Sequence, residues 1–355
     1  MKVLELFSGI GGMRCGISEA LAQDGADEQL NVVSVDLNIF CNEIYEKSFK
    51  SKPHAMEICS VTADWCDAID ADVWTMSPPC QPYTRQGLLL DSADDRAKPL
   101  LHLVGVLGRI TKLPKMIIVE NVKNFEVSDS FKKLREMLEL RNFELVGYML
   151  NPLFMGFPNS RLRFFLVAVL KPNSERAPFR IVTNDPTCTE FDFIDTRPAV
   201  AREISEFLCH NHGEDVRDKL QVPHSLLVKR AAMCFDVVAK ASKQCLCFTR
   251  SYRKFINGTG SVLYEGAGDL VIGQDDMARP KFEIDSMEKL DGTLRYFCPV
   301  EAARLNGFNV NDDACKWSLS FEDSCGGSIQ YYRAIGNSLN PHVVAFVVKR
   351  HRLVS

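Results

Sequence analysis

The chain has 355 residues, a hydrophobic content of 46%, a charged content of 25% and a formal net charge of −4. These values are ordinary for a soluble globular protein, and the length suggests two domains or one enlarged domain. No apolar run approaches the ~18 residues of a membrane helix, and the start, MKVLELFSGIGG, turns polar and glycine-rich too early for a secretory signal. The acidic balance excludes a uniformly basic surface, but a local basic patch is enough to bind nucleic acid.

Apolar runs and helical patterns alternate along the chain up to Leu170. Six of the runs have the length of buried strands, and apolar residues at helical spacing predict helices from Met13 and over Ser130–Leu140. This alternation predicts an α/β domain with a largely parallel sheet, in which ligands bind outside the carboxyl ends of the strands. The expected strands are Lys2–Phe7, Asn31–Asn38, Ala71–Pro79, Lys115–Val122, Phe143–Leu150 and Arg163–Leu170.

After Pro172 the alternation weakens and turn residues become more frequent, which predicts a second, smaller domain over residues 186–325. Near the end of the sequence, Asn-Ser-Leu-Asn-Pro at 337–341 begins an apolar helical segment. We expect this helix to pack against the first domain, so that residues 1–185 and 326–355 form one unit.

The turn FSGIGG (Phe7–Gly12) follows the first expected strand and opens the first helix. Glycines there allow a tight turn and let a ligand approach the backbone closely. The turn lacks the lysine of a phosphate-binding loop, which favours a nucleoside-containing cofactor; an ordinary strand-to-helix turn is the alternative. Asp36 ends the second strand, where a carboxylate binds ribose hydroxyls or caps the next helix.

The sequence SPPCQPYTRQG (Ser77–Gly87) places Cys80 in a proline-rich loop after the third strand. Prolines fix φ and remove backbone donors, so this loop is stiff and is neither a helix interior nor a central strand. A lone cysteine is usually a small buried apolar residue. Here the stiff loop, its place at a strand end and the nearby cation of Arg85, which favours the thiolate, indicate a nucleophile.

Polar residues also flank the fourth and sixth strands. Glu120 and Asn121 end the fourth strand, where a protonated Glu120 can donate to a ring nitrogen; a cap for the following segment is the alternative. In NSRLRFF, Arg161 and Arg163 are two residues apart and are expected to share one face of a strand start. Two guanidinium groups can hold a carbonyl oxygen or a phosphate, and a solvated charged edge is the alternative.

Residues 221–260 form a basic stretch with one acid in a chain that is acidic overall. Phe248, Tyr252 and Phe255 lie among the charges. Positive charge combined with rings that can stack suits nucleic acid with unpaired bases, whereas a solvated charged face is the alternative. The basic residues are Lys229, Arg230, Lys240, Lys243, Arg250, Arg253 and Lys254.

The 13 cysteines are scattered without a Cys-x-x-Cys pair, which indicates reduced thiols in the cytoplasm or nucleus. Cys209, His210 and His212 form the only tight group with metal-ligand chemistry. Zinc sites usually bring two separated ligand pairs, so we expect no metal in this group. The missing Cys-x-x-Cys pair also argues against a thiol-redox enzyme.

The motifs FSGIGG, SPPCQPYTRQG, IIVENV, GFPNSRLRFFLVA and RAIGNSLNPHVV stand in the order found in cytosine-5 methyltransferases, and this resemblance covers essentially the whole chain. It implies a class I S-adenosylmethionine-dependent methyltransferase: a Rossmann-like, mostly parallel sheet with helices on both faces, plus a smaller target-recognition domain. CFTRSY, GTGSVL and LRYFCPVEAARLNGF further resemble the branch of type-two DNA-methyltransferase homologues, which implies methylation of an anticodon-loop cytosine in tRNA-Asp.

The resemblance also implies roles for individual residues. Cys80 would add to C6 of cytosine, Glu120 would protonate or hydrogen-bond N3, and Arg163, together with Arg161, would hold the O2 side. S-adenosylmethionine would give its methyl group to C5 and leave as S-adenosylhomocysteine. The expected cofactor-binding residues are Phe7, Ile10, Gly11, Gly12, Asp36, Ile58, Cys59, Ser77, Asn337 and Ser338. The expected substrate-binding residues are Asn121, Lys240, Lys243, Cys247, Phe248, Thr249, Arg250, Tyr252, Arg253 and Lys254.

Three functions stay open on the sequence alone. The small second domain and Cys-Phe-Thr at 247–249 favour a tRNA methyltransferase over a DNA cytosine-5 methyltransferase, which would use the same chemistry. A protein that binds cofactor and nucleic acid without turnover is the third, and the intact set of Cys80, Glu120, Arg161 and Arg163 argues against it. We expect a monomer with tRNA as its partner, in the cytoplasm or also in the nucleus, and not at a membrane.

Overall fold

The computed structural model shows two compact units. The first comprises Met1–Asn151, Leu162–Asp195 and Pro341–Ser355, and the second comprises Pro152–Arg161 and Thr196–Asn340. The described residues are 1–23, 25, 30–80, 95–172, 175–198, 200–209, 214–267, 271–312, 314–315, 317–321 and 328–351.

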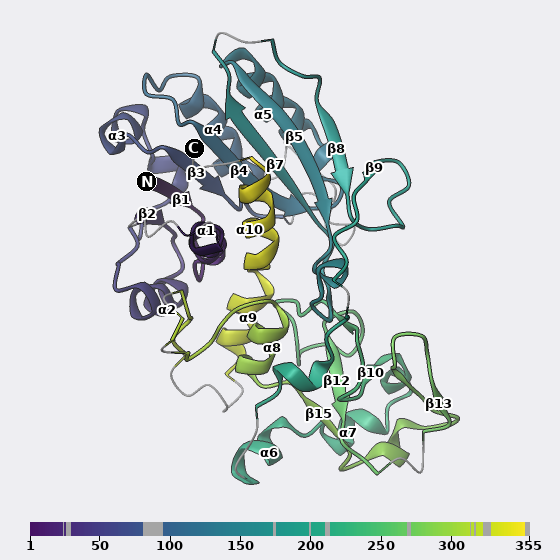
Figure 1. Ribbon diagram of the computed structural model, residues 1–355. Coiled ribbons are helices and arrows are strands. Elements are labelled where there is room, and N and C mark those ends of the chain that lie inside the picture. Colours follow the sequence, from purple (N-terminus) through teal and green to yellow (C-terminus); the bar gives the residue numbers. More distant parts are fainter. Residues whose placement is uncertain are drawn as a thin grey trace. The chain divides into compact units, whose positions relative to one another are not determined.

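The first unit is built on an eight-stranded sheet with the strand order β2-β1-β3-β4-β7-β5-β8-β9 (Figure 1). Neighbouring strands are parallel except at β7, which is antiparallel to both β4 and β5. Because of this reversal, Arg163 at the start of β7 pairs with Val122 at the end of β4. The strands are β1 Lys2–Leu6, β2 Asn31–Val35, β3 Val73–Met76, β4 Met116–Val122, β5 Phe143–Leu150, β7 Arg163–Leu170, β8 Arg180–Thr183 and β9 Asp192–Phe193.

Helices cover both faces of this sheet (Figure 1). Leu4 and Leu6 of β1 share an apolar core with residues of α3, α4 and α5, whereas Glu5 points to the opposite face and contacts α1 and α2. α10 packs against α1 at Gly16, where a Cβ would collide with Val344. The bounds are α1 Gly12–Gln23, α2 Ile39–Phe49, α3 Ala63–Ile69, α4 Lys98–Leu107, α5 Asp129–Leu140 and α10 Pro341–Arg350, with short 3-10 turns η1 Ile58–Ser60, η4 Asp95–Ala97 and η5 Phe125–Val127.

Helix α5 shows how the local sequence produces these elements. Ser128 precedes the helix in an extended conformation, and its side chain accepts a hydrogen bond from the backbone N–H of Phe131, which caps the first turn. Phe131, Leu134 and Leu138 recur at helical spacing and are buried in the apolar core. The same periodicity leaves the charged side chains of the helix on its outer face.

A buried carboxylate lies on the face of β1 that α1 and α2 cover. Glu5 is 1% exposed; its Oε2 accepts a hydrogen bond from the Tyr45 hydroxyl at 2.7 Å, and its Oε1 accepts one from the Arg14 backbone N–H at 3.2 Å. Burial raises the pKa of Glu5 from 4.5 to about 7, although both hydrogen bonds oppose this shift. The fold therefore favours the protonated, neutral form of Glu5.

We expect Glu5→Gln to remove a pH dependence of stability. Because the pKa of Glu5 is higher in the folded state, its contribution is complete below pH 4.5 and is lost as pH rises through about 7. Relative to the Gln variant, the wild type should lose about 3 kcal/mol of unfolding free energy between pH 4.5 and pH 8.5. Denaturant unfolding at several pH values checks this, with Glu43→Gln on the exposed side of α2 as the control. Parallel pH curves for wild type and Glu5→Gln would contradict it.

The second unit has short elements around three small sheets, one of which is the β13–β14 pair. Another has the order β10-β12-β15, and β11 pairs with β6 in the third. The strands are β6 Asn159–Ser160, β10 Asp236–Val238, β11 Cys245–Leu246, β12 Ser261–Tyr264, β13 Gly273–Gln274, β14 Pro280–Lys281 and β15 Leu294–Tyr296. The helices and 3-10 turns are η6 Pro152–Met155, η7 Ile204–Phe207, α6 Glu214–Leu220, α7 His224–Leu227, η8 Arg230–Cys234, η9 Met287–Leu290, α8 Pro299–Leu305 and α9 Ile329–Gly336.

The structure confirms the α/β class, the six expected strands and the final helix that packs on the first unit. The antiparallel direction of β7 was not expected from the sequence. The units also divide differently from the expected boundaries at 185/186 and 325/326. Residues 186–195 stay with the large sheet because β9 pairs with β8. Residues 152–161 and 328–340 belong to the second unit, since β6 pairs with β11 and α9 packs on α8. The division of tasks between cofactor and target recognition stays a prediction.

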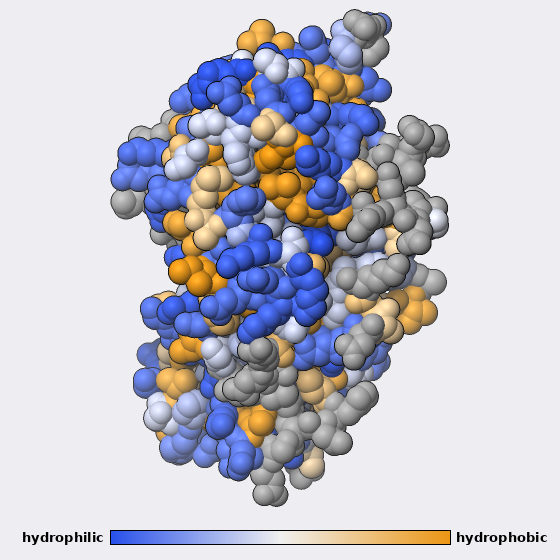
Figure 2. Space-filling view, turned by 90° about the vertical axis from the view of Figure 1, so that its left-hand side faces the viewer, coloured by the Kyte–Doolittle hydropathy of each residue, from blue (hydrophilic) through white to orange (hydrophobic). Residues whose placement is uncertain are grey.

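The face in Figure 2 is mostly hydrophilic, and its hydrophobic residues lie in groups among hydrophilic ones. Within the described part of the chain, no helix is long and apolar enough to cross a membrane.

Candidate active site

The carboxyl ends of β3 and β4 bring the expected nucleophile and the expected acid to one edge of the sheet. Cys80 lies four residues beyond the end of β3 and is half-buried. Glu120 and Asn121 are near the end of β4, and the Asn121 side chain donates to the Pro78 carbonyl at 3.3 Å. Asn121 therefore connects the end of β4 to the loop that carries Cys80. This hydrogen bond helps to position the loop.

Glu120 and Arg163 form an ion pair at this edge. Arg163 Nε lies 3.5 Å from Glu120 Oε1, and the two side chains are 20% and 11% exposed. A second guanidinium nitrogen of Arg163 donates to the Leu162 carbonyl at 2.8 Å. The antiparallel direction of β7 creates this pair, because it turns the start of that strand toward the end of β4. A carboxyl group and a guanidinium side by side can bind the ring nitrogen and the adjacent carbonyl of a pyrimidine.

Arg161 is placed differently from the prediction that it shares a strand face with Arg163. β7 begins only at Arg163, and Arg161 lies in the second unit with 4% of its surface exposed. Its guanidinium donates to Cys247 Sγ at 2.9 Å and to the Phe248 carbonyl at 3.4 Å. It also donates to the carbonyls of Gly336 and Ser338. Arg161 thus connects two chain segments of the second unit, and its expected role as a substrate ligand stays a prediction.

The glycine turn adopts the tight conformation that its sequence indicates. Phe7, Gly9 and Gly11 have positive φ values of 58°, 50° and 86°. A Cβ at Gly9 would meet nothing within 4 Å, so the backbone there is open to a ligand, whereas a Cβ at Gly11 would collide with the Phe49 ring. The Ser8 hydroxyl is buried in the same turn and has no hydrogen-bond partner among the described residues.

Asp36 holds this turn from the end of β2. Its Oδ2 accepts a hydrogen bond from the Gly9 backbone N–H and its Oδ1 accepts one from the Asn38 backbone N–H, both at 2.8 Å. The cap of α2 is Asn38, whose side chain accepts from the Cys41 backbone N–H. The alternative interpretation of Asp36 as the helix cap is therefore wrong.

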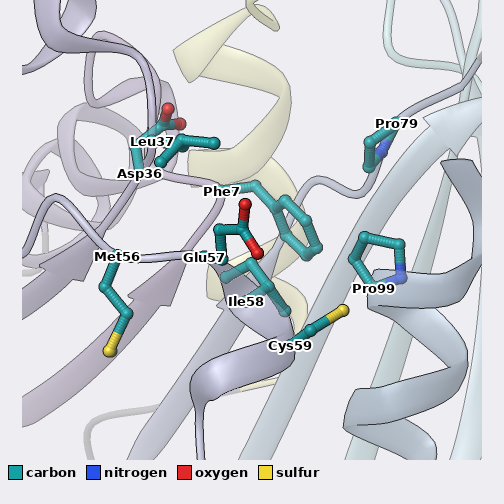
Figure 3. A pocket seen from close by; sticks show the side chains of 9 residues that line it. All are labelled: Phe7, Asp36, Leu37, Met56, Glu57, Ile58, Cys59, Pro79 and Pro99. Carbon is teal, nitrogen blue, oxygen red and sulfur yellow. The ribbon is translucent and has the colours of Figure 1, made fainter.

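A pocket of about 340 Å³ opens beside Phe7 and Asp36. Figure 3 shows Phe7 and Ile58 in its middle, between Asp36 and Leu37 on one side and Pro79 and Pro99 on the other. Its walls are mainly apolar, with carboxylates from Asp36 and Glu57. The lining residues are Phe7, Asp36, Leu37, Met56, Glu57, Ile58, Cys59, Pro79 and Pro99.

Four of the expected cofactor residues line this pocket, namely Phe7, Asp36, Ile58 and Cys59. Ile10, Gly11 and Gly12 are buried in the turn behind it, and Ser77 is bound through its backbone N–H to Leu6 at 3.4 Å. Asn337 and Ser338 belong to the second unit and stay predictions. Glu57 was not expected from the sequence, although a carboxylate directly before Ile58 is a local signal. Pro99 comes from the first turn of α4, far from this segment in the sequence, and carries no such signal.

The expected substrate residues of the second unit divide into exposed charges and buried packing residues. Lys240, Arg250 and Lys254 are exposed, as is Phe255 at 57%. Lys243 and Thr249 are half-buried, and their backbone N–H groups donate to Met277 and Thr259. The Arg253 guanidinium lies 5.0 Å from the Tyr296 ring and donates to the Lys219 carbonyl. Cys247 is half-buried beside Arg161.

Phe248 and Tyr252 do not offer their rings to a nucleic acid. They are 3% and 2% exposed, and their rings pack edge to face at 5.0 Å. Phe248 also contacts Phe297, and the Tyr252 hydroxyl donates to the Ser261 carbonyl at 2.7 Å. The expectation that these two rings stack on bases is therefore wrong. Their side chains pack the interior of the second unit and fix the shape of the segment between them.

Some sequence-based interpretations fall outside the residues that the structure describes. Arg85, the cation expected to favour the Cys80 thiolate, belongs to the segment 81–94, and His210 and His212 belong to 210–213. Their interpretations stay predictions.

Comparison with known proteins connects this geometry to a chemistry. The family model described as C-5 cytosine-specific DNA methylase matches residues 1–352. A tRNA (cytosine(38)-C(5))-methyltransferase of Homo sapiens is 33% identical, over 98% of each chain. A DNA (cytosine-5)-methyltransferase of Dictyostelium discoideum is 32% identical, over 98% of this chain and 93% of the relative. The solved structure of the S. pombe Dnmt2 methyltransferase superposes with a TM-score of 0.74 at 30% identity, covering 99% of this chain and 98% of that one.

The fold, the edge that carries Cys80 and Glu120, and the full-length matches agree with one another, and they confirm the resemblance in the sequence. Membership implies S-adenosylmethionine as the methyl donor. The chain belongs to the cytosine-5 methyltransferase family and has the class I methyltransferase fold.

Proposed function

We propose that this protein methylates C5 of an anticodon-loop cytosine, cytosine 38, in tRNA, with tRNA-Asp as the preferred substrate. The names of relatives at 33% identity over the whole chain support the choice of tRNA. The observation that carries the chemistry is the shared edge of β3 and β4, where a half-buried thiol follows one strand and a carboxyl–guanidinium pair ends the next.

The pocket beside the glycine turn fits the adenosine part of S-adenosylmethionine. Apolar walls from Phe7, Ile58 and Pro79 suit a purine ring, and the carboxylate of Asp36 suits ribose hydroxyls. The open backbone at Gly9 and the buried Ser8 hydroxyl offer polar groups to the remaining part of S-adenosylmethionine. When bound, S-adenosylmethionine supplies an electrophilic methyl group, and S-adenosylhomocysteine is the product.

The residues of the chain would prepare cytosine for that methyl group. The Cys80 thiolate forms a bond to C6, and the electron pair of the C5–C6 double bond moves toward C5 and the ring. In its protonated form Glu120 donates to N3, and Arg163 donates to O2, which stabilises the negative charge that the ring acquires. After C5 has been methylated, a base removes the C5 proton, the C5–C6 double bond forms again and the thiolate leaves. A loop base is already unpaired, so its entry to Cys80 costs less than extrusion from a duplex.

DNA is the second candidate substrate, because one relative of similar identity is named a DNA (cytosine-5)-methyltransferase. The deciding experiment offers labelled S-adenosylmethionine with unmodified tRNA-Asp or with duplex DNA to the purified chain. We expect label in cytosine 38 of the tRNA and none in DNA, and a tRNA with that cytosine replaced by uridine is the matched control. Comparable label in DNA would move the assignment to DNA, and no label in either, with cofactor bound, would overturn the proposed activity.

We expect the exposed cations of the second unit to carry part of the RNA affinity. Each Lys or Arg that contacts a phosphate adds to the dependence of binding on salt. Arg250→Gln together with Lys254→Gln should therefore lower the slope of log affinity against log salt by about one to two units. Lys132→Gln with Lys133→Gln on the exposed side of α5 is the matched control. An unchanged slope in the first pair would show that these charges do not contact RNA.

The same proposal includes a monomer that acts in the cytoplasm or also in the nucleus. Sedimentation of the purified chain tests the first part, since a concentration-independent mass near 39.9 kDa is expected.

A further inference from the structure

Two cysteines of the second unit lie with their sulfur atoms in contact. Cys209 Sγ and Cys298 Sγ are 3.9 Å apart, and neither is in a disulfide. Cys209 follows the 3-10 turn η7, which ends at Phe207, and is half-buried. Cys298 is buried at the start of α8, where its sulfur accepts a hydrogen bond from the Glu301 backbone N–H at 3.5 Å. Neither residue belongs to the proposed cytosine chemistry.

A metal centre at this place is unfavourable, although Glu301 lies within 4.8 Å of both sulfur atoms. Both oxygens of Glu301 are already occupied. Oε1 accepts from the Cys209 backbone N–H and from Arg295, and Oε2 accepts from the Cys298 backbone N–H and from Arg295. A second guanidinium, that of Arg304, lies 3.8 Å from Cys209 Sγ. The Arg304 guanidinium beside Cys209 opposes a cation and favours a thiolate, and the Arg295 guanidinium already neutralises Glu301.

The two thiols differ in their surroundings. Cys209 is partly accessible and lies beside the Arg304 guanidinium, which stabilises negative charge on its sulfur. The Cys298 thiol is hydrogen-bonded to Cys209 and buried. Both effects raise the pKa of Cys298, so this thiol stays protonated. An accessible thiol beside a cation and a buried partner in contact with it are the two parts of a thiol pair that oxidation can close.

We propose that Cys209 and Cys298 are a modification site, at which a peroxide converts the two thiols into a reversible disulfide. The Cys209 thiolate attacks one oxygen of hydrogen peroxide, which breaks the O–O bond and gives a sulfenic acid and hydroxide. The hydroxide takes up the proton that the Cys209 thiol released and becomes water. The Cys298 sulfur then attacks the sulfenic sulfur and displaces the hydroxyl, which leaves as water with the Cys298 proton. In total, two thiols and one peroxide give one disulfide and two waters, and a dithiol reductant reverses the reaction.

The disulfide would tie the end of η7 to the start of α8. The sulfur atoms have to approach from 3.9 Å to about 2.05 Å, and Cys209 can supply this movement because it lies outside any helix or strand. The neighbouring Phe297 is bound through its backbone to the hydroxyls of Tyr252 and Tyr332. The link therefore closes next to the ring cluster that supports the Cys247–Arg253 segment, and a closed long loop stabilises the fold that contains it.

Peptide mapping of the full chain tests this proposal. After treatment with hydrogen peroxide and alkylation without reductant, we expect one linked peptide pair that contains Cys209 and Cys298 and that dithiothreitol separates. The pair should be absent in Cys209→Ser and in Cys298→Ser and present in Cys234→Ser, which alters an exposed cysteine elsewhere in the unit. Serine also caps helices, so Cys298→Ser keeps α8 and its loss of the link reports chemistry rather than unfolding.

Thermal unfolding gives a second readout that does not depend on the catalytic thiol. Oxidised Cys80→Ala protein should melt several degrees higher than its reduced form, and the added Cys209→Ser change should remove this difference.

In the peptide mapping, recovery of both cysteines as alkylated thiols, or of Cys209 as sulfinic acid without a link, would overturn the proposal. Stoichiometric Zn²⁺ that the untreated chain retains and that Cys209→Ser loses would overturn it in favour of a metal centre.

Discussion

Cys80→Ala is expected to lower methyl transfer to tRNA by at least about 10⁴-fold, since loss of a catalytic nucleophile removes the covalent step altogether. Cys80 lies beyond the end of β3 and does not line the pocket proposed for S-adenosylmethionine. The variant should therefore bind the cofactor with unchanged affinity. Single-turnover transfer of labelled methyl, together with calorimetric titration of the cofactor, measures the two quantities separately.

Cys234→Ala is the matched control for this experiment, because that cysteine is exposed and lies in the second unit. It should retain wild-type transfer. Substantial turnover by Cys80→Ala would remove Cys80 from the mechanism, and a parallel loss of cofactor affinity would show that the loop, rather than the thiol, had been disturbed.

Arg161→Ala should destabilise the second unit by about 3 kcal/mol or more, because each buried acceptor that loses its hydrogen bond costs about 1–3 kcal/mol. The guanidinium donates hydrogen bonds to Cys247 Sγ and to the carbonyls of Phe248, Gly336 and Ser338. Alanine removes this donor from all four acceptors. Arg161→Lys should recover only part of the lost stability, since an ammonium group cannot present its donors in the fork geometry of a guanidinium. Thermal unfolding with a probe in the second unit measures the effect.

Arg163→Ala separates the two arginines. Arg163 is paired with Glu120 and is more exposed, so its loss should lower kcat while the unfolding free energy changes by less than about 1 kcal/mol. If Arg161→Ala instead unfolded like the wild type and lost only kcat, Arg161 would be a catalytic residue rather than a positioning one.

The sequence was sufficient to predict features that depend on residues close together in the chain. Short apolar runs identified the central strands, and the polar residues directly after them, Cys80 and Glu120, meet at one edge because parallel strands end there. The sequence was insufficient where the partners are distant. The hydrogen-bond acceptors of Arg161 lie 86 to 177 positions away in the sequence. The spacing of charged residues does not predict these partners.

The basic stretch shows a second limit of sequence reasoning. Phe248, Tyr252 and Phe255 lie in one charged segment, yet only Phe255 is exposed among them. Burial of the first two depends on Phe297 and Tyr332, which lie beyond the segment. Composition therefore indicated a nucleic-acid surface, but the assignment of individual rings needed the packing.

The contact between α1 and α10 has a consequence for synthesis of the chain. Gly16 of α1 packs on Val344, and Glu19 bonds to His342 of the last helix. A ribosome that adds 5–20 residues per second needs roughly 15–60 s to reach α10 after it has made α1. Throughout that time one face of α1 lacks its partner, and the sheet beside it becomes complete only once β9 has been made. The nascent protein thus exposes an unfinished surface that a holding chaperone can cover, and premature termination before α10 would make that exposure permanent.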